Sequence, residues 1–98
     1  MNKLLITVSL AMSLSASASD ERNELCKDIG GLAKSIMQAR QSGAPAYDLI
    51  EILGDDNESL RAIVIDAYST PMFSTDEFKN REVTKFMNKW YLGCLGAK

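Results

Sequence analysis

The residues of this sequence that could do chemistry are its carboxylates and its two cysteines, because the 98-residue chain contains no histidine. Without histidine, Ser-His-Asp triads, Cys-His dyads and metal sites that use imidazole are excluded. Two carboxylate pairs at helical spacing could in principle perform acid–base catalysis, namely Glu24 with Asp28 and Glu51 with Asp55. Both pairs fall on polar helix faces, where solvated carboxylates are the ordinary finding. The sequence therefore predicts no catalytic site and no enzyme.

Oxygen-bearing side chains around residue 57 match two binding motifs in part. Asp55, Asn57, Ser59 and Asp66 stand at positions 1, 3, 5 and 12 of an EF-hand frame. Position 6, which must be glycine in a calcium loop, is Leu60. Capping of a helix N-terminus accounts for the same residues, so we expect no metal and no cofactor. Asn57 also begins a formal glycosylation sequon, which applies only to a eukaryotic secretory route.

The first eighteen residues, MNKLLITVSLAMSLSASA, have the features of a secretory signal peptide. Lys3 supplies a positive charge, residues 4–14 form an apolar run, and Ala16-Ser17-Ala18 matches a signal-peptidase site. The run is shorter than the ~20 apolar residues of a membrane span, so we expect no stable membrane insertion after cleavage. The sequence predicts a signal peptide over 1–18 and a single exported domain over 19–98, either periplasmic or secreted.

The two cysteines, Cys26 and Cys94, stand near the two ends of the expected mature chain. An even number of cysteines in an exported chain indicates a disulfide, and the lack of a CxxC motif argues against a redox-active pair. A domain of about 80 residues is only marginally stable without such a crosslink. We therefore expect a structural Cys26–Cys94 disulfide, with a free or catalytic thiol as the alternative.

Apolar residues recur with the period of an α-helix in four segments, and no segment shows the two-residue alternation of a strand. The segments are residues 20–41, a short helix that begins at Pro45, residues 57–69, and a helix that follows Ser74. The apolar stripe of the first segment begins at Leu25, and the stripe of the last segment ends at Cys94. The predicted fold class is all-α: a small four-helix domain whose first and last helices are joined by the disulfide.

Local signals predict how these helices start, stop and pack. Gly54 is expected just after the second helix as its C′ residue. Ser74 is expected to cap the fourth helix in a capping box with Glu77. Ile65 lies off the apolar stripe of the third helix, which suggests that this helix is covered on two sides. Gly30-Gly31 would either kink the first helix or let another helix approach closely; we favour the close approach.

Large apolar side chains are the candidates for contact with a partner, since aromatic residues commonly anchor interfaces. Met72 and Phe73 lie in a predicted loop, and Phe73 is also expected to pack on Phe78 as a hydrophobic staple. Tyr91 follows a tryptophan on a helix, so the two cannot face one core, and Tyr91 is expected at the surface. We predict a partner-binding surface that includes Met72, Phe73 and Tyr91, with Arg40 as a polar anchor.

Five motifs cover nearly the whole expected mature chain. They are Cys-x-x-Ile-Gly at 26–30, Ile-Met-x-x-Arg-Gln-x-Gly at 36–43, Val-Ile-x-Ala-Tyr at 64–68, Ser-Thr-x-Glu at 74–77 and Trp-Tyr-x-x-Cys at 90–94. In these motifs the chain resembles small exported proteins predicted from bacteriophages, prophages and their bacterial hosts, a group without an established activity. The resemblance implies a bacterial periplasm. A looser similarity, of architecture only, is to the HdeA-type periplasmic acid-stress chaperones, which are also small, helical and held by one disulfide.

The charge of the chain narrows the possible partners. Eleven basic and thirteen acidic residues give a formal net charge of −2, which argues against a nucleic-acid-binding surface. We expect a non-catalytic, exported protein-binding module of phage or bacterial origin that occupies or inhibits a protein partner in the cell envelope. The alternative is an acid-activated periplasmic chaperone, because protonation of the carboxylates would remove ion pairs and expose apolar surface. The sequence does not indicate the oligomeric state.

Overall fold

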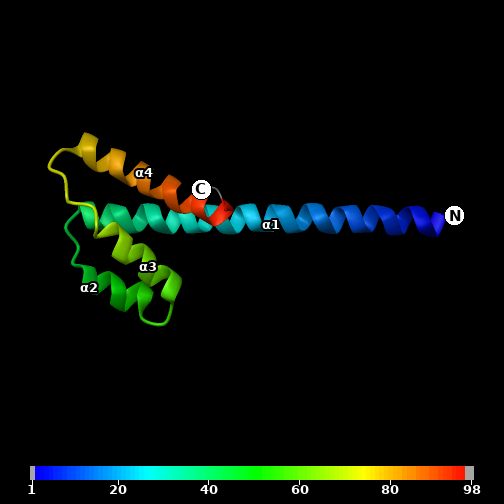
Figure 1. Ribbon diagram of the computed structural model, residues 1–98, viewed down its shortest axis with the longest axis horizontal. Helices are drawn as coiled ribbons and strands as arrows, with labels where there is room; N and C mark the ends of the chain where they lie inside the picture. Colours follow the sequence, from blue (N-terminus) through cyan, green and yellow to red (C-terminus); the bar gives the residue numbers. More distant parts are fainter. Residues whose placement is uncertain (1, 97–98) are drawn as a thin grey trace.

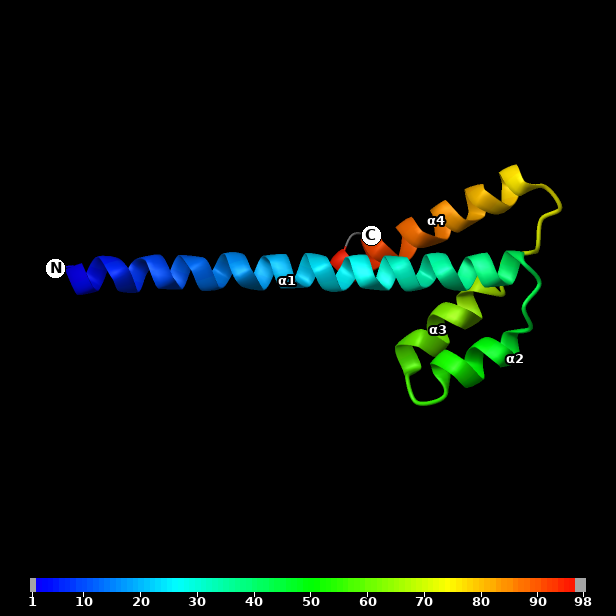
Figure 2. The same ribbon diagram turned by 180° about the vertical axis from the view of Figure 1, so that it is seen from behind.

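The computed structural model consists of a long helix, α1, against which a second long helix and a group of shorter helices pack (Figure 1). The structure describes the backbone of residues 2–96 and the side chains of residues 20–96. In chain order the elements are α1 (Asn2–Gln41), α2 (Ala46–Leu49), η1 (Ile50–Gly54), α3 (Glu58–Ala67) and α4 (Asp76–Leu95). α4 runs back along one side of α1, and the shorter elements lie on another side, as the view from behind also shows (Figure 2). The prediction of an all-α fold with four helices is confirmed.

α1 is longer than the sequence predicts at its N-terminal end and ends where expected. It begins at Asn2 instead of residue 20; the expected signal peptide, residues 1–18, lies outside the residues whose side chains are described. Within the described part of the chain, no helix has the length and apolar character of a membrane span. After Gln41, Gly43 takes a φ of 92°. This left-handed turn, which glycine adopts without strain, closes the last turn of the helix.

The core forms where α1, α3 and α4 face one another. Its buried hydrophobic residues recur at the predicted spacing of three or four in each helix; they are Ala33, Ile36 and Met37 of α1, Ile63, Val64 and Ala67 of α3, and Val83 and Phe86 of α4. Leu25, the expected start of the α1 stripe, is instead 60% exposed, whereas Cys26 is buried. Successive residues point about 100° apart around a helix, and here Cys26 is the residue that faces α4.

The disulfide joins Cys26 of α1 to Cys94 of α4, as predicted, and their Cα atoms are 5.4 Å apart. The two helices lie close together near this bond and diverge toward the start of α4 (Figures 1 and 2). Gly30 allows the close approach, because a Cβ atom at this position would lie 3.2 Å from the Cβ of Tyr91. A Cβ on Gly31 would meet nothing within 4 Å. The close-packing interpretation is therefore correct for Gly30 within one chain, whereas no other helix of this chain packs against Gly31.

The second helical segment differs from the prediction at its end. α2 follows Pro45, which precedes the helix as its N-cap residue, and continues as one turn of π-helix, η1. Gly54 was expected to end this helix in the left-handed conformation, but among the described glycines only two others have positive φ. Gly54 is needed for packing instead, since a Cβ there would lie 3.0 Å from the Cα of Arg61 in α3. The absence of a side chain lets η1 and α3 cross closely.

Side-chain caps begin both α3 and α4. Asn57, one of the polar residues expected to cap this helix, is the residue that caps α3. α4 is capped by Thr75 instead of Ser74, so the predicted capping box with Glu77 is wrong. Glu77 instead lies 3.8 Å from Arg81 in an exposed ion pair. Both neighbouring hydroxyls are able to cap a helix, and the position of the preceding loop decides which of them does.

α3 is covered on two sides, by α1 and by η1, as expected. The residue from which this was inferred does not take part, because Ile65 is 60% exposed. Its position on the helix falls outside both contact faces. The correct expectation therefore rested on the wrong residue, and Ile65 is part of the surface.

Candidate functional site

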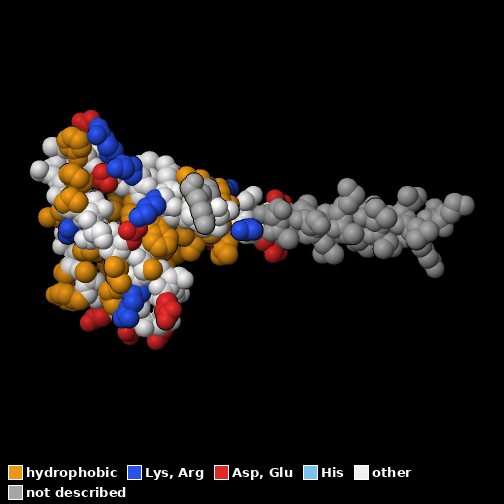
Figure 3. Space-filling view, viewed as in Figure 1, with side chains coloured by type: hydrophobic (Ala, Val, Ile, Leu, Met, Phe, Trp, Pro, Cys, Tyr) orange, Lys and Arg blue, Asp and Glu red, His pale blue; other side chains and the backbone are white. Residues whose placement is uncertain are grey.

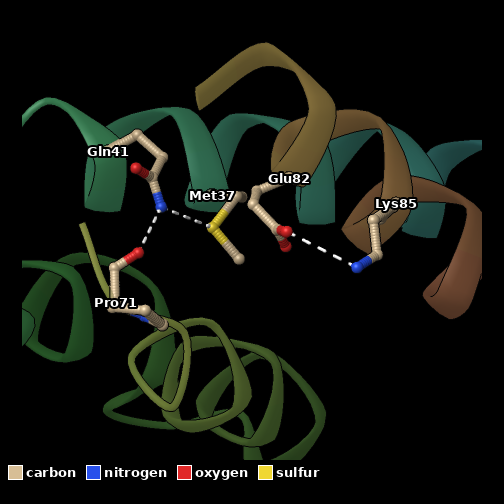
Figure 4. A network of polar contacts seen from close by, with 5 residues as sticks. All are labelled: Met37, Gln41, Pro71, Glu82 and Lys85. Atoms are coloured by element: carbon tan, nitrogen blue, oxygen red, sulfur yellow. Dashed lines mark hydrogen bonds and ion pairs between the residues drawn. The ribbon is translucent and has the colours of Figure 1, made fainter. Parts of the chain in front are cut away.

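A single buried glutamine holds the loop between α3 and α4 against the end of α1. Gln41 is the last residue of α1 and is only 3% exposed. Its side-chain N–H donates to the carbonyl of Pro71 at 3.0 Å, and its side-chain oxygen accepts from the N–H of Phe73 at 2.8 Å. The same amide nitrogen lies 3.6 Å from the Sδ of Met37 (Figure 4). The two hydrogen bonds to the loop flank Met72, whose backbone is thereby fixed from both sides.

Two further side chains tie the loops at this end to one another. The hydroxyl of Tyr68, at the end of α3, donates to the carbonyl of Ala44 in the α1–α2 loop. Arg40 donates from Nε to the carbonyl of Thr70 at 3.0 Å, and its guanidinium lies 4.9 Å from the centre of the Tyr68 ring. Burial raises the pKa of the Tyr68 phenol, the charge of Arg40 opposes this, and the carboxylate of Asp48 reinforces it. The phenol is thus held neutral as a hydrogen-bond donor.

Apolar side chains lie on the outside of this end of the protein. Met72 is 53% exposed and Phe78 is 45% exposed. The rings of Phe73 and Phe78 pack with their centres 6.1 Å apart, which confirms the expected contact. Hydrophobic side chains gather along this end of the body in the space-filling view (left side of Figure 3). We call Met72, Phe73 and Phe78 the loop-end patch.

The structure brings together only part of the predicted binding surface. Met72 and Phe73 lie in the loop-end patch. Arg40 lies beneath the α3–α4 loop, where its guanidinium is engaged by contacts within the fold. Tyr91 is thirteen residues after Phe78 on α4, and therefore about 20 Å farther along that helix. Tyr91 belongs to a different surface, where α4 passes Gly30.

The prediction missed Gln41, although the sequence contains a signal for it. Gln41 continues the spacing of four that runs through Ala33 and Met37, both of which are fully buried. A polar residue on an apolar stripe must find hydrogen-bond partners when it is buried. Phe78 was predicted only to pack on its aromatic partner, and its exposure adds it to the patch.

A second polar contact links α3 to α4. The Oδ2 atom of Asp66 accepts from the indole N–H of Trp90 at 2.9 Å and from the Nζ of Lys89 at 2.7 Å. Trp90 therefore faces α3, whereas the next residue, Tyr91, faces α1. The adjacent aromatic residues serve different contacts, as predicted, but Tyr91, which was expected at the surface, is half-buried beside Gly30. The other ion pairs of the described side chains are surface pairs, such as Glu82 with Lys85 (Figure 4), and pairs of this kind add little stability.

The residues considered for metal binding or catalysis are dispersed. Among the side chains from residue 20 to residue 96, no three carboxylates or cysteines lie close enough together to hold a metal ion. Asn57, the third position of the EF-hand frame, uses its side chain to accept the N–H of Leu60. Glu24 lies in an exposed ion pair with Lys27. These contacts assign Asn57 to helix capping and Glu24 to surface pairing.

The fold and the loop-end patch define a class of protein: a small all-α domain, closed by a disulfide between its first and last helices, with a rigidly held apolar loop. Comparison of the chain with protein-family models, with curated proteins and with solved structures finds no match.

Proposed function

We propose that this chain is an exported, non-catalytic protein-binding module of bacterial or phage origin, which occupies or inhibits a partner in the cell envelope through the loop-end patch. The observation that carries the proposal is the environment of Met72. Its side chain is more than half exposed, although its backbone lies between two hydrogen bonds from a buried glutamine. A backbone that is already fixed loses little conformational freedom on binding, and methionine and aromatic residues are enriched in interface cores.

The disulfide supports the expected location, because such bonds persist in oxidising compartments such as the periplasm. The test of export is to express the full gene in a bacterium and measure the mass of the protein recovered from the periplasm. We expect a chain that begins at Ser19 and contains the Cys26–Cys94 bond. Recovery of the uncleaved chain from the cytoplasm would contradict this part of the proposal.

The test of binding is capture of a partner from a bacterial envelope extract on the tagged, oxidised protein, read by quantitative mass spectrometry. We expect one dominant partner at near-stoichiometric yield. Met72→Ser should lower this yield at least about tenfold, as loss of an interface anchor does. Ile65→Ser is the matched control, because Ile65 is similarly exposed on another face. Equal loss with both variants, or no loss with either, would refute the assignment of the patch.

One contact favours a second candidate function, the acid-activated chaperone. Asp66 bonds Trp90 and Lys89 across the junction of α3 and α4. Loss of this contact would leave the indole N–H of Trp90 and the ammonium of Lys89 without their shared acceptor and would weaken this junction. For this function we expect the protein to suppress aggregation of an unfolded client at pH 3, and Asp66→Asn to do so at a higher pH than the wild type. A protein that stays folded and inactive at pH 3 would exclude it.

A further inference from the structure

We infer that a furrow between α1 and α4 docks an amphipathic helix of another protein that carries acidic residues seven positions apart. The furrow consists of two hollows on successive turns, lined by residues of these two helices and by Ser42, which follows α1. It does not include any residue of the loop-end patch. The inference therefore stands independently of the binding surface proposed above.

The first hollow, of about 450 Å³, has an apolar floor. The floor is formed by Gly30, Gly31, Met87 and Tyr91, and the hollow lies near the disulfide, where the two helices converge. Nothing in the structure lies within 4 Å of the position of a Cβ on Gly31. A bare backbone surface of this kind allows another helix to approach closely.

The second hollow, of about 400 Å³, is more polar and extends the furrow toward the start of α4. Gln38, Asp76 and Lys79 are among the residues that line it. On α1 the two hollows together run from Lys27 to Gln41, which corresponds to about 21 Å of helix. This length fits a helix of about four turns.

The charge on the edge of the furrow specifies the chemistry of the occupant. Lys27 and Lys34 flank the apolar floor seven residues apart, on one face of α1. Lys27 lies 3.5 Å from Glu24 in a pair that is mostly exposed on both sides, and Lys34 forms no ion pair with any side chain in the range 20–96. At the other hollow, the charge of Lys79 is cancelled by the charge of Asp76. Lys79 also donates to the carbonyl of Gln41. The furrow is therefore positive, although the whole chain has a formal charge of −2.

A second copy of this chain does not fit the furrow well. A symmetric dimer brings the same surface of both copies together. Lys27 and Lys34 of one copy would then lie against the same lysines of the other. Like charges in such positions repel, whereas carboxylates seven residues apart on a partner helix would complement the two lysines.

The test is selection from a displayed library of 16-residue helical peptides on the immobilised, oxidised protein. We expect the enriched peptides to carry Asp or Glu seven positions apart with small or apolar residues between them. Their Kd should rise at least about tenfold with Gly31→Leu, which fills the furrow where the fold has open space. Lys34→Glu should have an effect of similar size.

Two matched variants separate the furrow from general effects on the fold. Gly93→Leu introduces the same side chain at another helical glycine with open space around it, and Lys85→Glu reverses another exposed lysine. Both should leave the Kd unchanged within about twofold. Enriched peptides without the acidic pattern, equal binding to Gly31→Leu, or no enrichment at all would overturn the inference. Two other results would also overturn the inference, because each would assign the furrow to a different occupant. One is binding to phosphatidylglycerol vesicles that depends on Lys34, and the other is a dimer that Gly31→Leu abolishes.

Discussion

Replacement of Gln41 by alanine should destabilise the protein and release the loop that carries Met72. The substitution removes the hydrogen bonds to Pro71 and Phe73, which measure 3.0 and 2.8 Å, from a side chain that is 3% exposed. A neutral hydrogen bond contributes about 1 kcal/mol net, and a buried group left without a partner costs about 1–3 kcal/mol. We therefore expect Gln41→Ala to lower the free energy of unfolding by about 2–3 kcal/mol.

The assay for this prediction is urea unfolding of the oxidised protein together with hydrogen exchange of the Phe73 amide. Gln38→Ala is the matched control, because Gln38 is an exposed glutamine on the same helix. We expect the control to change the free energy of unfolding by less than about 0.5 kcal/mol and to leave exchange at Phe73 unchanged. The reasoning would be refuted if both variants had the same stability, or if the Phe73 amide stayed equally protected in Gln41→Ala.

Three further predictions concern the helix pair, the crosslink and the loop contact. Both Gly30→Ala and Gly31→Ala gain up to about 1 kcal/mol of helix propensity, but only Gly30→Ala overpacks against Tyr91. Gly30→Ala should therefore be less stable than Gly31→Ala by about 1–3 kcal/mol; thermal unfolding of the pair measures this difference, and equal stabilities would contradict the packing described above. Replacing Cys26 and Cys94 together by serine should lower the free energy of unfolding by about 4 kcal/mol by the loop-entropy relation, as measured by urea unfolding against the oxidised wild type. A decrease of less than about 1 kcal/mol would contradict this stabilising role of the crosslink. Burial raises the pKa of Tyr68 in the folded state above its ordinary value of 10.0, so the stability that the phenol contributes is complete below pH 10 and declines as the pH rises through the raised pKa. Tyr68→Phe should be less stable than the wild type at pH 7 but should lose less stability above pH 10. Unfolding free energies with parallel pH profiles would contradict this.

The helical segments were predictable because they depend on local patterns. The spacing of three and four in Ile63, Val64 and Ala67 places them on one face of α3 whatever that helix packs against. The end of α1 near Gly43 and the cap at Asn57 were predictable for the same reason, since each needs only neighbouring backbone atoms. The crosslink followed from the number of cysteines and from the expected compartment.

The candidate site was predictable only in part. Met72 and Phe73 could be assigned to a loop, because Pro71 and a cluster of hydroxyl residues interrupt the helical period around them. Their exposure could not be predicted, since a large apolar residue in a loop is as suited to the core as to a partner. The separation of Tyr91 from the loop-end patch was itself predictable, because Phe78 and Tyr91 lie thirteen residues apart on one predicted helix and are therefore about 20 Å apart along it.

By itself, the sequence determined the all-α class, the main helix positions and the cysteines that close the domain, because hydrophobic period, caps and residue counts are local properties. Only the tertiary structure decided which of two adjacent residues takes each role. Gly30 touches α4 and Gly31 does not, and Thr75 caps α4 although Ser74 is equally able. Adjacent helical residues point about 100° apart, so the direction from which another helix or loop approaches selects one of them. The burial of Gln41 has the same origin, because its partners come from a loop thirty residues farther along the chain.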